Sequence, residues 1–333
     1  GEKGISSSGK GKLTIQGKEG SSLSTTGGSG TQGGSFGICA TSGKLDLVNA
    51  TVTATGGFGG GTGISANDEV NIKNSKLIAN GGIYTNGKFT VGEGGEVIAI
   101  GGDDKTVKRS AWGGAALRFL GTGVGCGYEV QKGGKLTAIG GNAESESGDA
   151  EGGNALWGEY GGIVSAGETT LIGGNAKSST GKATGGDAIT GNSYYFERVT
   201  VKEGTFTAAG GKAENATDTA TNGNSVKITP VNYGDGRKPE LKVEEGGTFV
   251  TAKPGESDDN GNGITGEIKI NTQGGKIEEV ENAEVVKKED GTVDVVGDLV
   301  GVETGNLKYE LTATVEPTCT TPGKRVYTCT TPG

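Results

Sequence analysis

The chain has 333 residues, including 70 Gly and no His, and its 40 acidic residues against 31 Lys and Arg give a formal net charge of −9. The lack of His removes the commonest general base and most zinc and iron sites, and the scattered basic residues form no nucleic-acid footprint. No apolar run approaches the roughly 18 residues of a membrane span, so we expect a soluble protein.

One short phrase recurs along most of the chain: apolar-x-apolar, four or five residues, then apolar-x-small-x-Gly-Gly. Its apolar residues alternate with polar ones, which is the two-residue period of a strand with one buried face. Such short strands cannot bury a face alone, so successive copies must stack. Regular copies begin at Leu45, Val70, Phe89, Tyr128, Val199 and Leu241, a stretched copy begins at Leu13, and the copy near Gly173 is degenerate, with Thr169 at an apolar position.

A second phrase supplies a third strand in each unit. It reads Gly113 to Leu117, Gly152 to Leu156 and Gly185 to Ile189. Three short strands per coil predict an all-β fold, a right-handed parallel β-helix over residues 1–275, with roughly eight to eleven coils about 4.8 Å apart. We attribute the Gly-Gly pairs to corners that need positive φ or close backbone approach.

Polar insertions follow several Gly-Gly pairs, at residues 102–111, 142–151, 175–184 and 212–221. They leave the coil at one corner, so we expect them to line up as one flank of loops. Loops gathered on one side of a repeat protein are the usual place for recognition.

Aromatic residues are few and several adjoin this flank, where sugar rings could stack. Aligning the third-strand phrases places Arg118, Trp157 and Thr190 in one column, with Trp157 pointing outward. An outward Trp beside an Arg fits a carbohydrate platform, and it equally fits a residue that covers a strand end. The candidate carbohydrate-binding residues are Trp112, Arg118, Trp157, Tyr160, Tyr194 and Tyr195.

Asp258, Asn260 and Asn262 alternate with other residues before Gly263, as in a loop that wraps calcium. The twelfth position is Lys269, where a calcium loop has a bidentate Glu, so an Asx-rich turn is the alternative. The sequence establishes no cofactor; calcium is the one candidate, and the Asx-rich turn is the preferred interpretation.

Residues 276–314 form an acidic, β-rich segment. Residues 276–310 hold ten acids and four Lys, which is −6 of the total charge. The segment is either a coil that caps the β-helix or the start of another domain.

The phrase from Gly4 to Ile15 resembles that of secreted clostridial Gly-rich parallel β-helix proteins of the carbohydrate-binding-domain type, whose members include cellulose and pectin binders. This resemblance covers about residues 1–275. It implies a carbohydrate ligand.

Residues 315–333 begin a different module, since Cys-Thr-Thr-Pro-Gly occurs at Cys319 and again at Cys329. The tail resembles the Cys-x-x-Pro-Gly…Tyr-x-Cys repeats of large surface proteins of Gram-positive gut bacteria, which implies a secreted or cell-surface location. A chain reversal at Pro322-Gly323 predicts a disulfide between Cys319 and Cys329. A bond to a neighbouring repeat or a bound metal is the alternative.

The expected function is therefore a non-catalytic, extracellular adhesion or polysaccharide-binding module, acting as a monomer on a polysaccharide or a host glycan. A structural stalk is one alternative. A polysaccharide lyase or hydrolase is the other, because a fold does not fix a function.

Overall fold

The computed structural model describes most of the chain in short consecutive segments. These are residues 3–8, 11–18, 20–28, 35–40, 43–57, 61–119, 127–158, 161–192, 196–216, 219–230, 238–255, 263–266, 268–289, 292–304, 307–315 and 324–330.

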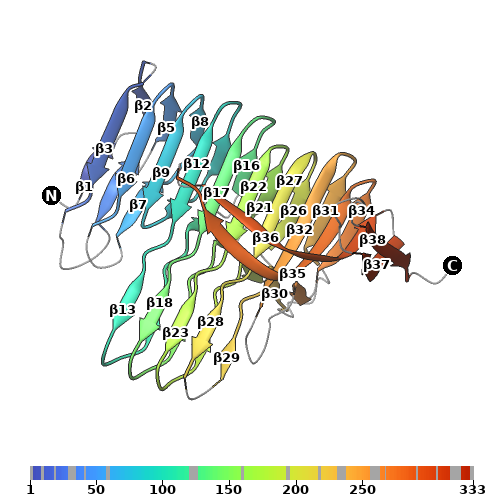
Figure 1. Cartoon of the computed structure of the whole chain (residues 1–333). Coiled ribbons are helices and arrows are strands. Elements are labelled where there is room, and N and C mark those ends of the chain that lie inside the picture. The colour runs from blue at the N-terminus through green and yellow to red at the C-terminus, as the bar shows by residue number, and fades with distance from the viewer. Residues whose placement is uncertain are drawn as a thin grey trace.

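Three long sheets form the sides of a parallel β-solenoid (Figure 1). Sheet A holds β1 (Lys3–Ser7), β4 (Phe36–Ala40), β7 (Thr62–Ala66), β10 (Ile83–Thr85), β15 (Leu117–Phe119), β20 (Leu156–Gly158), β25 (Ile189–Asn192), β30 (Val226–Thr229) and β33 (Ile264–Gly266). Sheet B holds β2 (Lys12–Gln16), β5 (Lys44–Val48), β8 (Val70–Lys73), β11 (Lys88–Val91), β16 (Gly127–Val130), β21 (Gly161–Ser165), β26 (Phe196–Val201), β31 (Glu240–Glu244) and β34 (Lys269–Gln273). Sheet C holds β3 (Ser22–Thr26), β6 (Thr51–Thr55), β9 (Lys76–Asn80), β12 (Glu96–Ile100), β17 (Lys135–Ile139), β22 (Glu168–Ile172), β27 (Gly204–Ala209), β32 (Gly247–Pro254) and β35 (Lys276–Lys287).

Each coil contributes one strand to each sheet, and the described residues make nine coils. All neighbouring strands from β1 to β35 in these three sheets pair in parallel, for example Leu45 with Val70 and Val97 with Leu136. The predicted parallel β-helix is therefore confirmed, and nine coils fall within the predicted range.

The apolar residues of the repeat point inward and form one continuous core along the axis. Phe89 and Phe119 both pack against Tyr128, and their ring centroids lie 5.3 and 5.7 Å from that of Tyr128. Thr169, the polar residue of the degenerate copy, is also buried, and its hydroxyl lies 2.9 Å from that of Ser165. Burying a hydroxyl costs little folding free energy when it is hydrogen-bonded, so the Ser165–Thr169 pair can replace apolar residues in the core of this coil.

The corner between sheets B and C turns through a left-handed residue in eight of the nine described coils. Asn49 and Asn74 fill it in the second and third coils, and Gly fills it elsewhere, as at Gly94 and Gly133. Gly has no Cβ to clash in this region, and Asn is among the few other residues that tolerate it. The Gly-Gly pairs of the repeat lie at another corner, after the strands of sheet C, and of those pairs only Gly81-Gly82 has a positive φ among the described residues.

The four insertions are strands and not loops, which corrects the prediction of a loop-bearing flank. They form two small parallel sheets whose inward Ala residues pack together, such as Ala143 and Ala150. We call each insertion a side arm; the arms span residues 101–114, 140–153, 173–186 and 210–223 and project from the solenoid (Figure 1). Sheet D holds β13 (Asp104–Thr106), β18 (Ala143–Ser145), β23 (Ala176–Ser178) and β28 (Ala213–Asn215), and sheet E holds β14 (Ala111–Trp112), β19 (Ala150–Glu151), β24 (Ala183–Thr184) and β29 (Ala220–Thr221).

A hydrogen-bonded chain of glycines joins the arms to the solenoid. Each backbone N–H donates to the carbonyl of the preceding glycine in the order 102, 114, 141, 153, 174, 186, 211 and 223, with N···O distances of 2.7 to 2.9 Å. We call this feature the glycine neck. None of its residues has a positive φ, and at every one except Gly102 an added Cβ would meet backbone atoms, so close backbone approach, and not a left-handed turn, requires glycine at those positions.

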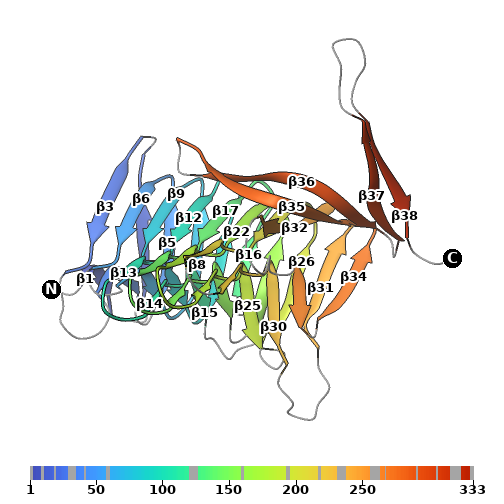
Figure 2. The same cartoon turned by 60° about the horizontal axis from the view of Figure 1, so that its bottom comes forward.

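The acidic segment continues sheet C and then folds back over it. β35 pairs in parallel with β32, and β36 (Val293–Thr304) pairs antiparallel with β35. Val293 and Val295 pack on the outer face of sheet C against Ile172 and Ala209. Figures 1 and 2 show this hairpin running back along the solenoid. β37 (Leu307–Val315) and β38 (Lys324–Cys329) extend the same antiparallel sheet.

Candidate functional site

Sheet A carries a column of outward residues, one from each of the fourth to eighth coils. The register pairs Tyr84 with Arg118, Arg118 with Trp157, Trp157 with Thr190 and Thr190 with Lys227. We call these five residues the sheet-A column. The predicted alignment of Arg118, Trp157 and Thr190 is present, and Leu117, Leu156 and Ile189 beside them are fully buried.

Three members of the sheet-A column stack on one another. The Arg118 guanidinium carbon lies 4.0 Å from the Trp157 ring centroid and 5.9 Å from that of Tyr84. These distances are within the range of cation–π attraction. All three side chains are half-buried, and the Arg118 Nε is buried without a hydrogen-bond partner among the described residues. The column is therefore an ordered strip of aromatic and cationic groups.

Tyr84 is a member of this strip that sequence reasoning missed. In the third coil, sheet C connects to sheet A through Gly81-Gly82 alone, with no side arm. The repeat phrase that begins at Val70 ends in Gly81-Gly82. The same pair also directly precedes the next third strand, Ile83–Thr85. Aligning Gly82-Ile83-Tyr84 with the other third-strand phrases would have found it.

Trp112 does not join the sheet-A column, because it lies on β14 in the first side arm. Its side chain is 57% exposed, and the Arg109 guanidinium carbon is 6.0 Å from the ring centroid. Of the three candidates among the described residues, Arg118 and Trp157 therefore stack together, and Trp112 lies apart from them on a side arm.

The adjacent acids Asp103 and Asp104 both have structural partners. Asp103 accepts a hydrogen bond from the backbone N–H of Asn142 at 2.7 Å. Asp104 accepts two from the Arg109 guanidinium, at 2.9 and 3.0 Å, and one from the backbone N–H of Trp112 at 3.1 Å. These contacts give both carboxylates a structural role in the first side arm.

Several predicted residues lie outside the described residues: Tyr160, Tyr194, Tyr195, Asp258, Asn260, Asn262 and Cys319. The calcium loop and the Cys319–Cys329 disulfide therefore stay predictions. In the described part, Cys329 is exposed and is the register partner of Tyr309 between β37 and β38, and Cys39 is buried. The described residues contain no group of three or more Cys, Asp or Glu placed to hold a metal ion.

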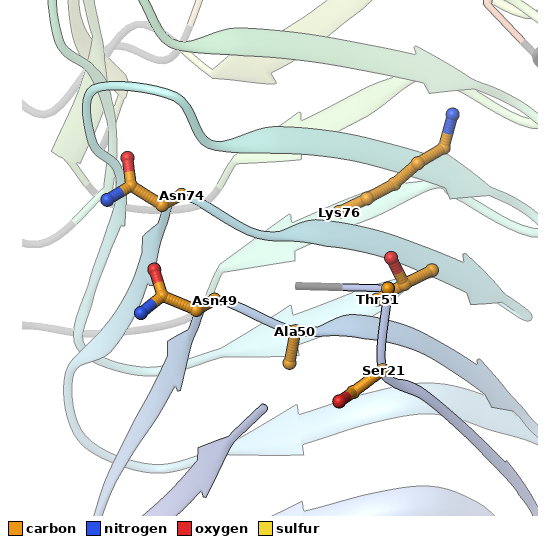
Figure 3. Close-up of a pocket in the computed structure, with 7 residues that line it drawn as sticks. Ser21, Asn49, Ala50, Thr51, Asn74 and Lys76 are labelled. Carbon is orange, nitrogen blue, oxygen red and sulfur yellow. The ribbon is translucent and has the colours of Figure 1, made fainter. Parts of the chain in front are cut away.

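A shallow recess of about 440 Å³ lies at the corner between sheets B and C near the N-terminal end (Figure 3). Asn49 and Asn74 extend to the same side there, beside Ser21 and Thr51. The ammonium of Lys76, at its edge, pairs with Glu96 at 2.8 Å. The recess has a polar lining without an aromatic platform.

None of the described segments forms an apolar helix long enough to cross a membrane.

No protein-family model and no curated protein matches the chain. Among solved structures, one similar chain is described as the crystal structure of PfbA, a surface adhesin of Streptococcus pneumoniae. It is 10% identical, with coverage of 94% of this chain and 88% of that chain, and the TM-score is 0.20. At that TM-score the fold assignment rests on the strand pairing described above.

Proposed function

We propose that this chain is a non-catalytic glycan-binding module of a secreted or cell-surface protein, and that the sheet-A column binds the glycan. The observation that carries the proposal is the stack of Tyr84, Arg118 and Trp157 on the outside of a rigid sheet. Aromatic rings offer flat apolar faces to the C–H faces of sugars, and nearby donors bond the hydroxyls.

The column is suited to an extended polysaccharide lying along the axis. Its groups repeat at the coil spacing of about 4.8 Å, which is close to the length of one sugar ring. Beyond Trp157 the column continues with the small Thr190 and then the ammonium of Lys227, which is 3.8 Å from Asp187. A chain bound there would meet a ring face, a hydroxyl and a charge in succession.

A binding role is favoured over hydrolysis by the residue chemistry. The chain has no His, and the carboxylates of Asp103 and Asp104 are engaged by Asn142, Arg109 and Trp112. A general acid or base must reach the reacting group. The sheet-A column itself contains no carboxylate.

Binding can be tested with a glycan array and with pull-downs on cellulose, pectin and mucin. Trp157→Ala should weaken binding at least about tenfold, since buried aromatic anchors commonly contribute 2 kcal/mol or more. Val296→Ala, at a 49% exposed position on the C-terminal hairpin, is the surface control and should leave binding unchanged.

Retention on none of these glycans would contradict the proposal, as would a Trp157→Ala variant that binds like the parent. The structural stalk would then be the better account. The continuous core and the glycine neck favour such a rigid rod.

A further inference from the structure

The two Trp residues of the chain lie on different surfaces, Trp157 on sheet A and Trp112 on the first side arm. Trp157 is half-buried, with Arg118 4.0 Å from its ring centroid. Trp112 is 57% exposed, and the Arg109 guanidinium carbon lies 6.0 Å from its ring centroid, the outer limit of cation–π attraction. The face of Trp112 is therefore the more open of the two.

The backbone at Trp112 is held by a polar cluster of Asp104 and Arg109. Its backbone N–H donates to Asp104 Oδ2 at 3.1 Å, and Asp104 accepts both Nη groups of Arg109. Arg109 Nη1 also donates to the carbonyl of Ser110 at 2.8 Å. A bidentate Arg–carboxylate pair fixes geometry as well as charge. Fixing the backbone that carries a large exposed ring in this way lowers part of the entropy lost when a ligand binds there.

The ring also lies at an open edge. β14 is the first strand of sheet E and β13 the first of sheet D, and no described strand pairs on their other side. The coils before them connect sheet C to sheet A without an arm strand in the described residues. On the next strand of sheet E, β19, the register partner of Trp112 is Glu151. On one side of Trp112 the neighbouring strand therefore carries a polar residue, Glu151. On the other side no described strand is paired with β14.

We propose that Trp112 and the Arg109–Asp104 pair form a second glycan subsite, so that one molecule bridges two glycan chains. This inference rests on the proposed function of the sheet-A column. The arm subsite takes a single exposed sugar ring, because no second aromatic residue follows Trp112 in the register of sheet E. The positions in line with it on the next three strands are Glu151, Thr184 and Thr221. The ring stacks on the indole, and its hydroxyls bond the remaining donors and lone pairs of Arg109 and Asp104.

Single-Trp variants separate the two subsites. Trp112→Phe leaves Trp157 as the only Trp, and Trp157→Phe leaves Trp112. Each is titrated with soluble oligosaccharides of cellulose, of pectin and of mucin, and the Trp emission is recorded. We expect both variants to respond, with separate binding curves.

Bridging is tested with beads that carry the same glycan. The parent protein and Val107→Ala, a control at a 54% exposed position of the same arm, should aggregate the beads. Trp112→Ala should still bind one glycan surface but should lower aggregation at least about tenfold, because the second contact is lost. Its melting temperature should match the parent's, since the side chain is exposed.

Aggregation by Trp112→Ala at the parent's level would overturn the inference while leaving the proposed function intact. A Trp112 emission that responds to a protein surface but to no sugar would also overturn it. If the parent binds no glycan, the proposed function fails as well.

Discussion

Replacement of one glycine in the glycine neck should destabilise the protein far more than replacement of another. In Gly153→Ala, the new Cβ would overlap the carbonyl oxygen of Gly114 and lie 2.7 Å from its carbonyl carbon, both of them backbone atoms. In Gly102→Ala, nothing lies within 4 Å of the new Cβ, and the φ of Gly102 is outside the left-handed region. The two variants share the same chemistry and the same hydrogen-bonded chain.

The expected cost of Gly153→Ala follows from two contributions. Forcing a methyl group into close-packed backbone costs about 1–3 kcal/mol. The shift also strains two hydrogen bonds, Gly153 N to Gly141 O at 2.8 Å and Gly174 N to Gly153 O at 2.7 Å. Each contributes about 1 kcal/mol, so the total is about 3–5 kcal/mol. Gly102→Ala should be neutral or slightly stabilising, since Ala lowers the entropy of the unfolded chain.

Denaturant unfolding followed by circular dichroism gives the free energies, and hydrogen exchange locates the change. Exchange should accelerate in the arms on either side of Gly153 and not at the N-terminal coils. Equal stabilities for the two variants would refute the argument that close approach, and not general flexibility, requires glycine in the neck.

Two further predictions concern titratable groups. Partial burial disfavours the charged carboxylate of Asp104, but hydrogen bonds from Arg109 and the Trp112 N–H outweigh it and lower its pKa below the ordinary 3.8. Its stabilising contribution is therefore full above the unfolded pKa and lost as pH falls through the folded one. Trp112 emission should change with a midpoint below pH 3.8, and a midpoint above it would contradict the assignment. Burial also raises the pKa of the Cys39 thiol, so it should resist a thiol reagent in the native protein. Non-reducing peptide mapping should find Cys319 linked to Cys329, and free thiols at both in the oxidised protein would contradict the disulfide.

The strand pattern was predictable because it depends on local alternation. Leu45 and Leu47 must face one side of a strand and Asp46 the other, and a one-residue slip would expose the core. The column of Arg118 and Trp157 followed from the same register. These positions could be found without knowing any long-range contact.

The side arms were mistaken for loops because their cores are made of Ala, which carries a weak hydrophobic signal. A signal was present, however. The four insertions have equal length, and Ala143 and Ala150 recur at the same places as Ala176 and Ala183. Loops have no reason to keep such a register, so equal length was evidence for pairing.

The docking of the C-terminal hairpin was not predictable from its own sequence. Val293 and Val295 indicate a strand, but their partners Ile172 and Ala209 lie far away in the chain and occupy outward positions of sheet C. An outward Ile is usual on a protein surface. Only the fold reveals that these positions form a stripe under the hairpin.

The glycine neck has a mechanical consequence for a rod that is pulled from its ends. The hydrogen bonds between coils run along the axis, so tension loads them directly, and coils give way where the fewest bonds join neighbours. The neck adds its own bonds between the fourth and eighth coils, in register with those of the three main sheets. Under load, coils outside this segment should therefore peel first, while the segment that carries the side arms and most of the sheet-A column stays folded.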